Sequence, residues 1–179
     1  MKNLRLQFKI QNYLLISALV VFLLSLLAMP VFAAELFFEA KNQEFVQGEE
    51  FIVSVFLNTA EESINAVEAK IYFPAELLKL KEIRDGNSII NFWIKRPKIE
   101  KTGIIDFSGI IPGGYQGRGG SLFSIVFQAG KSGNGAIEIN DARILQNDGK
   151  GTPVSIKISP LKISIFQIPS GVSLAEQKD

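Results

Sequence analysis

The feature that most constrains this chain is a repeated alternation of apolar and polar residues. It is clearest between Ile64 and Phe73, where Val67 and Ile71 fall on one side and Glu68 and Lys70 on the other. Successive side chains of a β-strand point to opposite faces of a sheet, so this pattern predicts a strand with one buried face. We find no long segment with the 3.6-residue period of an amphipathic helix after residue 33.

The same alternation recurs in short segments that are separated by Gly, Pro, Asn and Asp. Pro97 interrupts one of them, which marks an irregular or edge strand because proline cannot donate to a central ladder. Eight or nine strands with regular turns predict an all-β sandwich. These strands are drawn from ten alternating segments, residues 36–40, 51–57, 64–73, 78–83, 92–95, 104–111, 121–129, 136–140, 143–145 and 154–166.

Two glycine-rich loops resemble ligand sites at first inspection. The loop from Gly113 to Gly120 lacks the Gly-Lys-Ser/Thr ending of a phosphate loop, and a predicted strand follows it instead of a helix. We therefore predict a hairpin loop with positive φ at several glycines. Residues 147–152 lack the spaced acids and the terminal Glu of a calcium loop, so we predict a tight hairpin turn there.

Composition narrows the chemistry that the chain can perform. It contains no Cys and no His, which removes thiol and imidazole nucleophiles, histidine bases and the usual zinc ligands. Two carboxylates would suffice for a glycosidase, and Glu68 and Asp106 are the pair to consider, although the sequence does not show that they converge. We expect no catalytic residue, no metal site and no cofactor. The 14 Phe residues fit a thick core between two sheets.

The N-terminus has the features of an export signal. Lys2, Arg5 and Lys9 precede an apolar run over residues 13–29, and small or aliphatic residues flank a cleavage position after Ala33. We predict a signal peptide over residues 1–33, with an uncleaved membrane anchor as the alternative. In both cases the rest of the chain is secreted or displayed at the cell surface.

The predicted mature domain spans residues 34–168, and residues 169–179 form a polar tail or the start of a linker. The whole chain carries 19 basic and 18 acidic side chains, and removal of three N-terminal basic residues leaves 16 against 18. This near-neutral charge gives no electrostatic case for binding nucleic acid or an anionic membrane.

Candidate binding residues follow from the alternation in two segments. Residues on the polar side of 64–73 and of 104–111 would share an outward face, and aromatic residues there could stack on sugar rings. The alternative is a set of scattered, half-buried aromatics, namely Tyr72, Trp93 and Tyr115. The predicted partner-binding residues are Ala66, Glu68, Lys70, Tyr72, Ile104, Asp106, Ser108, Ile110 and Tyr115.

An ordered set of segments resembles a cohesin domain. The segments are residues 46–57, 64–74, 103–109, 119–127 and 147–152, and the resemblance extends over nearly all of the predicted mature chain. It implies a nine-stranded jelly-roll sandwich related to carbohydrate-binding modules. Cohesins are non-catalytic receptors that bind the calcium-loaded dockerin modules of polysaccharide-degrading enzymes, mostly through one sheet face.

The resemblance also implies roles for individual residues. An acidic dockerin contact of the family falls on Glu68, which is longer than the Asp usual there. Asp106 and Ser108 lie where cellulosomal members more often carry an apolar contact, so this face is more polar. We expect a monomer that binds a dockerin-like module, with direct binding of a polysaccharide as the alternative. A cellulosome setting does not follow, because the chain shows no dockerin, enzyme or cellulose-binding module.

Overall fold

A computed structural model of the chain describes residues 13, 15–20 and 33–167. The chain divides into two units, Met1–Val31 and Phe32–Asp179. In the first unit residues 13 and 15–20 are helical, and no helix within the described residues is long and apolar enough to cross a membrane. The predicted polar tail lies outside the described residues, as does most of the predicted signal peptide, so both stay predictions.

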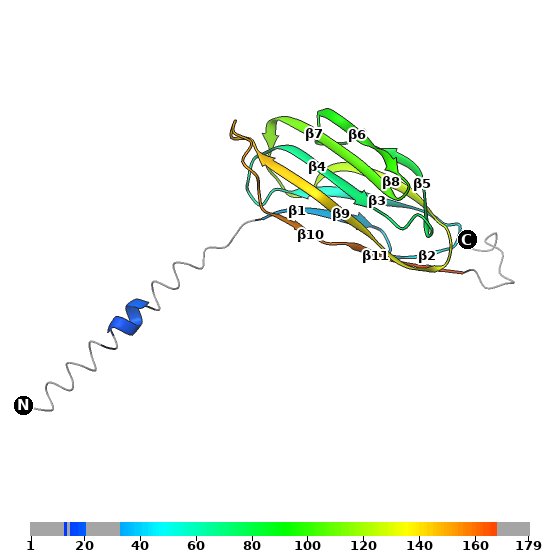
Figure 1. Cartoon of the computed structure of the whole chain (residues 1–179), viewed down its shortest axis with the longest axis horizontal. Coiled ribbons are helices and arrows are strands. Elements are labelled where there is room, and N and C mark those ends of the chain that lie inside the picture. Colours follow the sequence, from blue (N-terminus) through cyan, green and yellow to red (C-terminus); the bar gives the residue numbers. More distant parts are fainter. Residues whose placement is uncertain (1–12, 14, 21–32, 168–179) are drawn as a thin grey trace, which may run out of the picture. The chain divides into compact units, whose positions relative to one another are not determined.

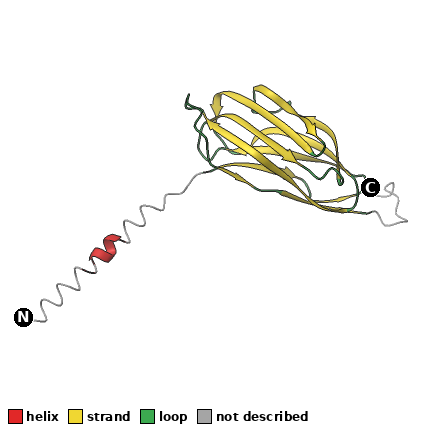
Figure 2. Cartoon of the chain, in the orientation of Figure 1, coloured by secondary structure: helices red, strands yellow, loops and turns green. Residues whose placement is uncertain are grey.

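The second unit is an all-β sandwich of two sheets, as predicted (Figures 1 and 2). One sheet has five strands in the order β10 (Ile156–Ile158), β1 (Ala34–Ala40), β3 (Glu50–Asn58), β8 (Gly120–Ala129) and β5 (Leu78–Arg84). The other has six strands in the order β2 (Glu44–Val46), β11 (Leu161–Phe166), β9 (Gly133–Gln146), β4 (Ile64–Tyr72), β7 (Ile104–Tyr115) and β6 (Phe92–Lys101).

Nine of these eleven strands are six residues or longer, which matches the predicted number, and the two additional strands, β2 and β10, have three residues each. The predicted segment 154–166 divides at Pro160, with β10 in one sheet and β11 in the other. β10 pairs in parallel with β1, and β11 pairs in parallel with β2. β6 is an edge strand, as Pro97 indicated, although it continues to Lys101.

The glycine-rich loop after β7 does not close a hairpin, which corrects the prediction. Gly113, Gly114 and Gly119 do have positive φ, at 85°, 79° and 73°. However, β7 pairs with β4 and β6, whereas β8 pairs with β3 and β5, so the loop carries the chain from one sheet to the other. A hairpin and an inter-sheet crossing need the same glycines between the same alternating strands, so local sequence cannot separate them.

Residues 147–152 do turn the chain back on β9, as predicted. The backbone N–H of Gln146 donates to the carbonyl of Thr152 at 2.9 Å, and that of Val154 donates to the carbonyl of Ile144 at 3.0 Å. The chain then leaves for β10 in the other sheet.

Phenylalanine rings join the two sheets. Phe107 of β7 meets Phe123 of β8 edge to face, with ring centroids 4.9 Å apart. Phe45 of β2 stacks on Phe51 of β3 at 3.6 Å, and Phe51 in turn contacts Phe127 of β8. All five rings are buried, so the predicted aromatic core between the sheets is confirmed. The Phe107–Phe123 and Phe45–Phe51 contacts each join a strand of one sheet to a strand of the other, whereas Phe51 and Phe127 lie on neighbouring strands of the five-stranded sheet.

We predict a large contrast between a buried and an exposed phenylalanine. Phe107→Ala should lower the free energy of unfolding by about 3–5 kcal/mol, because it leaves a cavity between the sheets. Phe92→Ala, at a side chain that is 61% exposed, should change it by less than about 0.5 kcal/mol. Urea denaturation of both variants measures the difference, and equal losses would contradict this description of the core.

Candidate functional site

Eight of the nine predicted site residues lie on one outward face and meet as cross-strand neighbours. β4 and β7 are adjacent and antiparallel, and the residues between the predicted positions, such as Val67, Ile71 and Ile105, are buried. The eight therefore form four pairs: Ala66 with Ile110, Glu68 with Ser108, Lys70 with Asp106, and Tyr72 with Ile104. The structure places the side chains together, while their role in binding stays a prediction.

The flanking strands extend these pairs into rows across the sheet. β9 adds Leu145, Arg143, Asn140 and Glu138 beside β4, and β6 adds Phe92, Lys95, Lys98 and Lys101 beside β7. We call the outward surface of these four strands the β9–β4–β7–β6 face. The strand 92–95 was predicted, but its many register shifts concealed which of its side chains point outward.

One end of the face is apolar and hollowed. A cavity of about 250 Å³ there is lined by Ala66, Ile94, Ile110 and Leu145, with Glu68, Ser108 and Arg143 at its polar side. Ile94 is 66% exposed and Phe92 is 61% exposed, more than any other large apolar side chain described between residues 33 and 167. A concentration of exposed apolar side chains on one face indicates an interaction surface.

The centre of the face is occupied by internal ion pairs. The Nζ of Lys95 lies 2.5 Å from the Oδ2 of Asp106, and the Nζ of Lys70 lies 3.2 Å from the Oδ2 of Asp141. Hydrogen bonding to these carboxylates raises the pKa of Lys95 and the pKa of Lys70. Only 13% of the Asp106 side chain is exposed. Asp106 is therefore committed to Lys95 and has little surface left for a partner.

Glu68 is the more available carboxylate. Its side chain is 52% exposed, and its nearest cation is the guanidinium of Arg143 at 3.9 Å. At that distance the pair is exposed and loose, so the carboxylate keeps hydrogen-bonding capacity for a partner.

Tyr115 and Trp93 do not belong to the outward face: this corrects the predicted position of Tyr115, and for both rings it agrees with the alternative of half-buried aromatics. Tyr115 pairs with the fully buried Ile64 and packs against the core, because a bulge before it in β7 reverses its orientation. The Trp93 ring meets Phe123 edge on at 6.3 Å and packs above Gly109. Of the proposed aromatic strip, only Tyr72 faces outward.

The loop at residues 147–152 is held by Asp148. One carboxylate oxygen accepts hydrogen bonds from the backbone of Lys150 at 2.8 Å and of Gly151 at 3.0 Å, and the other accepts from the hydroxyl of Thr152. These bonds, chiefly the one from Thr152, lower the pKa of Asp148. The loop thus has the organisation of a carboxylate-capped turn, in agreement with the prediction.

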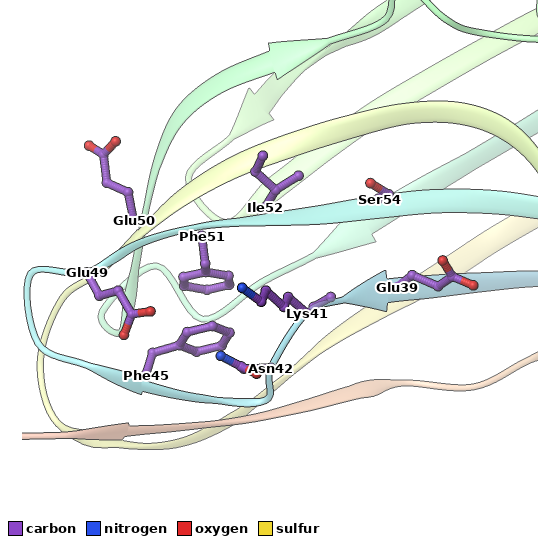
Figure 3. A pocket seen from close by; sticks show the side chains of 10 residues that line it. Glu39, Lys41, Asn42, Phe45, Glu49, Glu50, Phe51, Ile52 and Ser54 are labelled. Atoms are coloured by element: carbon purple, nitrogen blue, oxygen red, sulfur yellow. The ribbon is translucent and has the colours of Figure 1, made fainter. Parts of the chain in front are cut away.

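A larger cavity, of about 670 Å³, lies where the chain passes from the end of β1 to β2 in the other sheet (Figure 3). Phe45 and Phe51 stack at its base, but they are only 3% and 8% exposed. At its rim Glu50 pairs with Lys81 at 3.4 Å, and Glu49 accepts a backbone hydrogen bond from Val46. Its aromatic and acidic groups are thus largely engaged within the protein, so it is a weaker candidate than the β9–β4–β7–β6 face.

Comparison with known proteins identifies the fold. No known family profile and no curated protein matches the sequence. Among solved structures, the seventh ScaB type I cohesin of Pseudobacteroides cellulosolvens superposes with a TM-score of 0.64 and 17% identity, covering 79% of this chain and 97% of that one.

Two further structures give the same result. A non-cellulosomal cohesin of the archaeon Archaeoglobus fulgidus has a TM-score of 0.61 and 18% identity, over 75% of this chain and 91% of its own. A type I cohesin–dockerin complex of Clostridium thermocellum has a TM-score of 0.61 and 20% identity, over 75% of this chain and 99% of the matched one. The sandwich therefore has the cohesin fold, as the ordered segments predicted.

We predict that Asp148 stabilises the protein in a pH-dependent way. Because its pKa in the folded chain lies below the ordinary 3.8, its contribution is present above about pH 4 and is lost as the pH falls through the lowered value. Asp148→Ala should therefore be less stable than the wild type at roughly pH 7, and the difference should shrink as the pH falls below about 4. Thermal midpoints across this range measure the effect, and a difference independent of pH would refute it.

Proposed function

We propose that this chain is an exported, non-catalytic binding module that presents its β9–β4–β7–β6 face to a dockerin-like protein in a system that degrades polysaccharides. The observation that carries the proposal is the apolar hollow lined by the exposed side chain of Ile94, with the exposed Phe92 beside Ile110 on the neighbouring edge strand. The cohesin fold supports it, since several structures of that fold were solved as cohesin–dockerin complexes. Export rests on the predicted signal over residues 1–33.

Rigid display is the mechanism that this architecture supports. β4 lies between β9 and β7, so its backbone is hydrogen-bonded on both sides. Its inward side chains, Val67, Ala69 and Ile71, are buried in the core. Docking on the outward side chains would therefore cost no conformational entropy for ordering the backbone beneath them. More of the favourable contact energy then appears as affinity.

Affinity and specificity come from different parts of the face. Ile94, Ile110 and Leu145 offer apolar surface in the hollow, where an inserted side chain is removed from water. Glu68 at its edge offers an exposed carboxylate that discriminates between partners by charge and hydrogen bonding. Asp106 contributes indirectly, because its ion pair fixes the side chain of Lys95.

The arrangement of the two candidate carboxylates favours binding over glycoside hydrolysis. Asp106 faces Lys95, and Glu68 faces Arg143, so each acid has its own cation. Both acids stand on the outward surface of a sheet, where a sugar ring would be contacted from one side only, and only 13% of the Asp106 side chain is exposed.

Direct binding of a polysaccharide is the second candidate function. The predicted strip for sugar stacking is reduced, because Trp93 and Tyr115 pack toward the core. The aromatic side chains that remain on the face are Tyr72 and the exposed Phe92. A flat apolar ring such as that of Phe92 could still support one sugar unit.

We predict that Ile94 is an anchor for a protein partner. With calcium-loaded dockerin-like modules from the same genome as probes, Ile94→Ala should weaken the tightest complex at least about tenfold, or about 1.4 kcal/mol. Glu68→Ala should also weaken it, and thermal midpoints should hardly change for either variant. The matched control is Ile52→Ala, at a side chain 47% exposed on the opposite sheet, which should bind as the wild type does. Calorimetry that shows the reverse pattern would place the site elsewhere.

A pull-down on insoluble polysaccharides separates the two candidate functions. We predict that neither the wild type nor Phe92→Ala is retained, because the binding surface serves a protein. Retention of the wild type that is lost in Phe92→Ala would instead establish sugar stacking on this face.

A further inference from the structure

The β9–β4–β7–β6 face has a second hollow at the end opposite Ile94. It encloses about 600 Å³ and is lined by Tyr72 and Ile104 from the strands, by Glu138 of β9, and by Glu76 in the turn after β4. Tyr72 and Ile104 are cross-strand partners, as Ala66 and Ile110 are at the first hollow. The two hollows thus lie at the two ends of the same pair of strands.

The charges of the face are distributed unevenly between its centre and this end. The central cations and anions neutralise one another through the Lys95–Asp106 and Lys70–Asp141 pairs. Glu76 and Glu138 are exposed, and within residues 33–167 neither has an ion-pair partner. Lys101 and Lys162 stand on nearby strands without pairing to them. The unsatisfied negative charge is therefore at the rim of the second hollow.

This combination of groups suits a long basic side chain. The aliphatic stem of an arginine or lysine can lie on Ile104 and on the ring of Tyr72, while its cationic head reaches Glu76 or Glu138. An aromatic face adds attraction for the cation. A neutral or acidic side chain would leave both carboxylates without a partner.

The separation of the hollows sets a length for the partner. Tyr72 lies six positions after Ala66 along β4, which corresponds to about 20 Å at roughly 3.3 Å per strand residue. A helix that lies along β4 and β7 spans this distance in about 13 to 14 residues, since it rises 1.5 Å per residue, and residues about 14 apart lie on the same side of the helix because a turn takes 3.6 residues.

We propose that the partner docks through two anchors about 20 Å apart, an apolar side chain in the hollow beside Ile94 and a basic side chain between Glu76 and Glu138. This inference rests on the proposed function, because it takes the same face as the docking surface. It adds the chemical character of the partner, and the carboxylates supply the charge complementarity that selects it.

The test selects binders from a displayed library of a rigid helical scaffold with randomised surface residues, with the purified full chain as target. Enriched clones should carry an Arg or Lys about 14 residues from an apolar residue on the same side of the helix. Their affinity should fall at least about tenfold on the double variant Glu76→Gln with Glu138→Gln, and raising the salt concentration should remove most of that difference. The matched control, Glu39→Gln on the outward side of the opposite sheet, should bind within about twofold of the wild type.

The outcomes distinguish this inference from the function on which it rests. Clones that lose affinity with Ile94→Ala but not with the double glutamate variant would overturn the basic anchor and leave the docking face intact. Clones that respond to neither change would overturn both, and so would a selection that enriches no binder.

Discussion

The contact between Phe107 and Phe123 across the two sheets is the constraint on which the candidate site depends. It holds β7 with Phe107 inward, and because side chains alternate along a strand, Asp106 and Ser108 must then point outward. A slip of one residue would exchange the two sets and bury the charged ones. The composition of the outward surface is therefore a consequence of core packing, and it requires no loop to hold it.

The centre and the two ends of that surface differ in charge. Two internal ion pairs neutralise charges at the centre. One end has exposed apolar side chains around Ile94, and the other has exposed carboxylates around Glu138. A bulge in β9 contributes to this arrangement, since Asp141 adopts a left-handed φ of 52° and its carboxylate meets Lys70. Self-pairing limits nonspecific attraction of charged proteins and leaves recognition to the ends of the face.

Much of this could be predicted from local sequence, because alternation reports directly which side of a strand is buried. The outward positions of Glu68, Lys70 and Tyr72 follow from residues 64–73 alone. The orientation of Trp93 and Tyr115 does not, because bulges in β6 and β7 change the alternation where they occur. The crossing at residues 113–120 was missed because sheet membership depends on distant strands. Lys95 could not be predicted as the partner of Asp106, because that pairing depends on the register between β6 and β7. The strand β2 was missed because its three residues are too few to show an alternation.

The most direct test of the central claim, that the β9–β4–β7–β6 face is the docking surface, is a map of backbone amide chemical shifts on addition of the tightest-binding dockerin-like module. Docking on this face should concentrate the shifts in residues 66–72, 92–95, 104–110 and 138–145 of these four strands. Shifts concentrated instead in β1, β3, β8 and β5 would place the partner on the opposite sheet and contradict this claim.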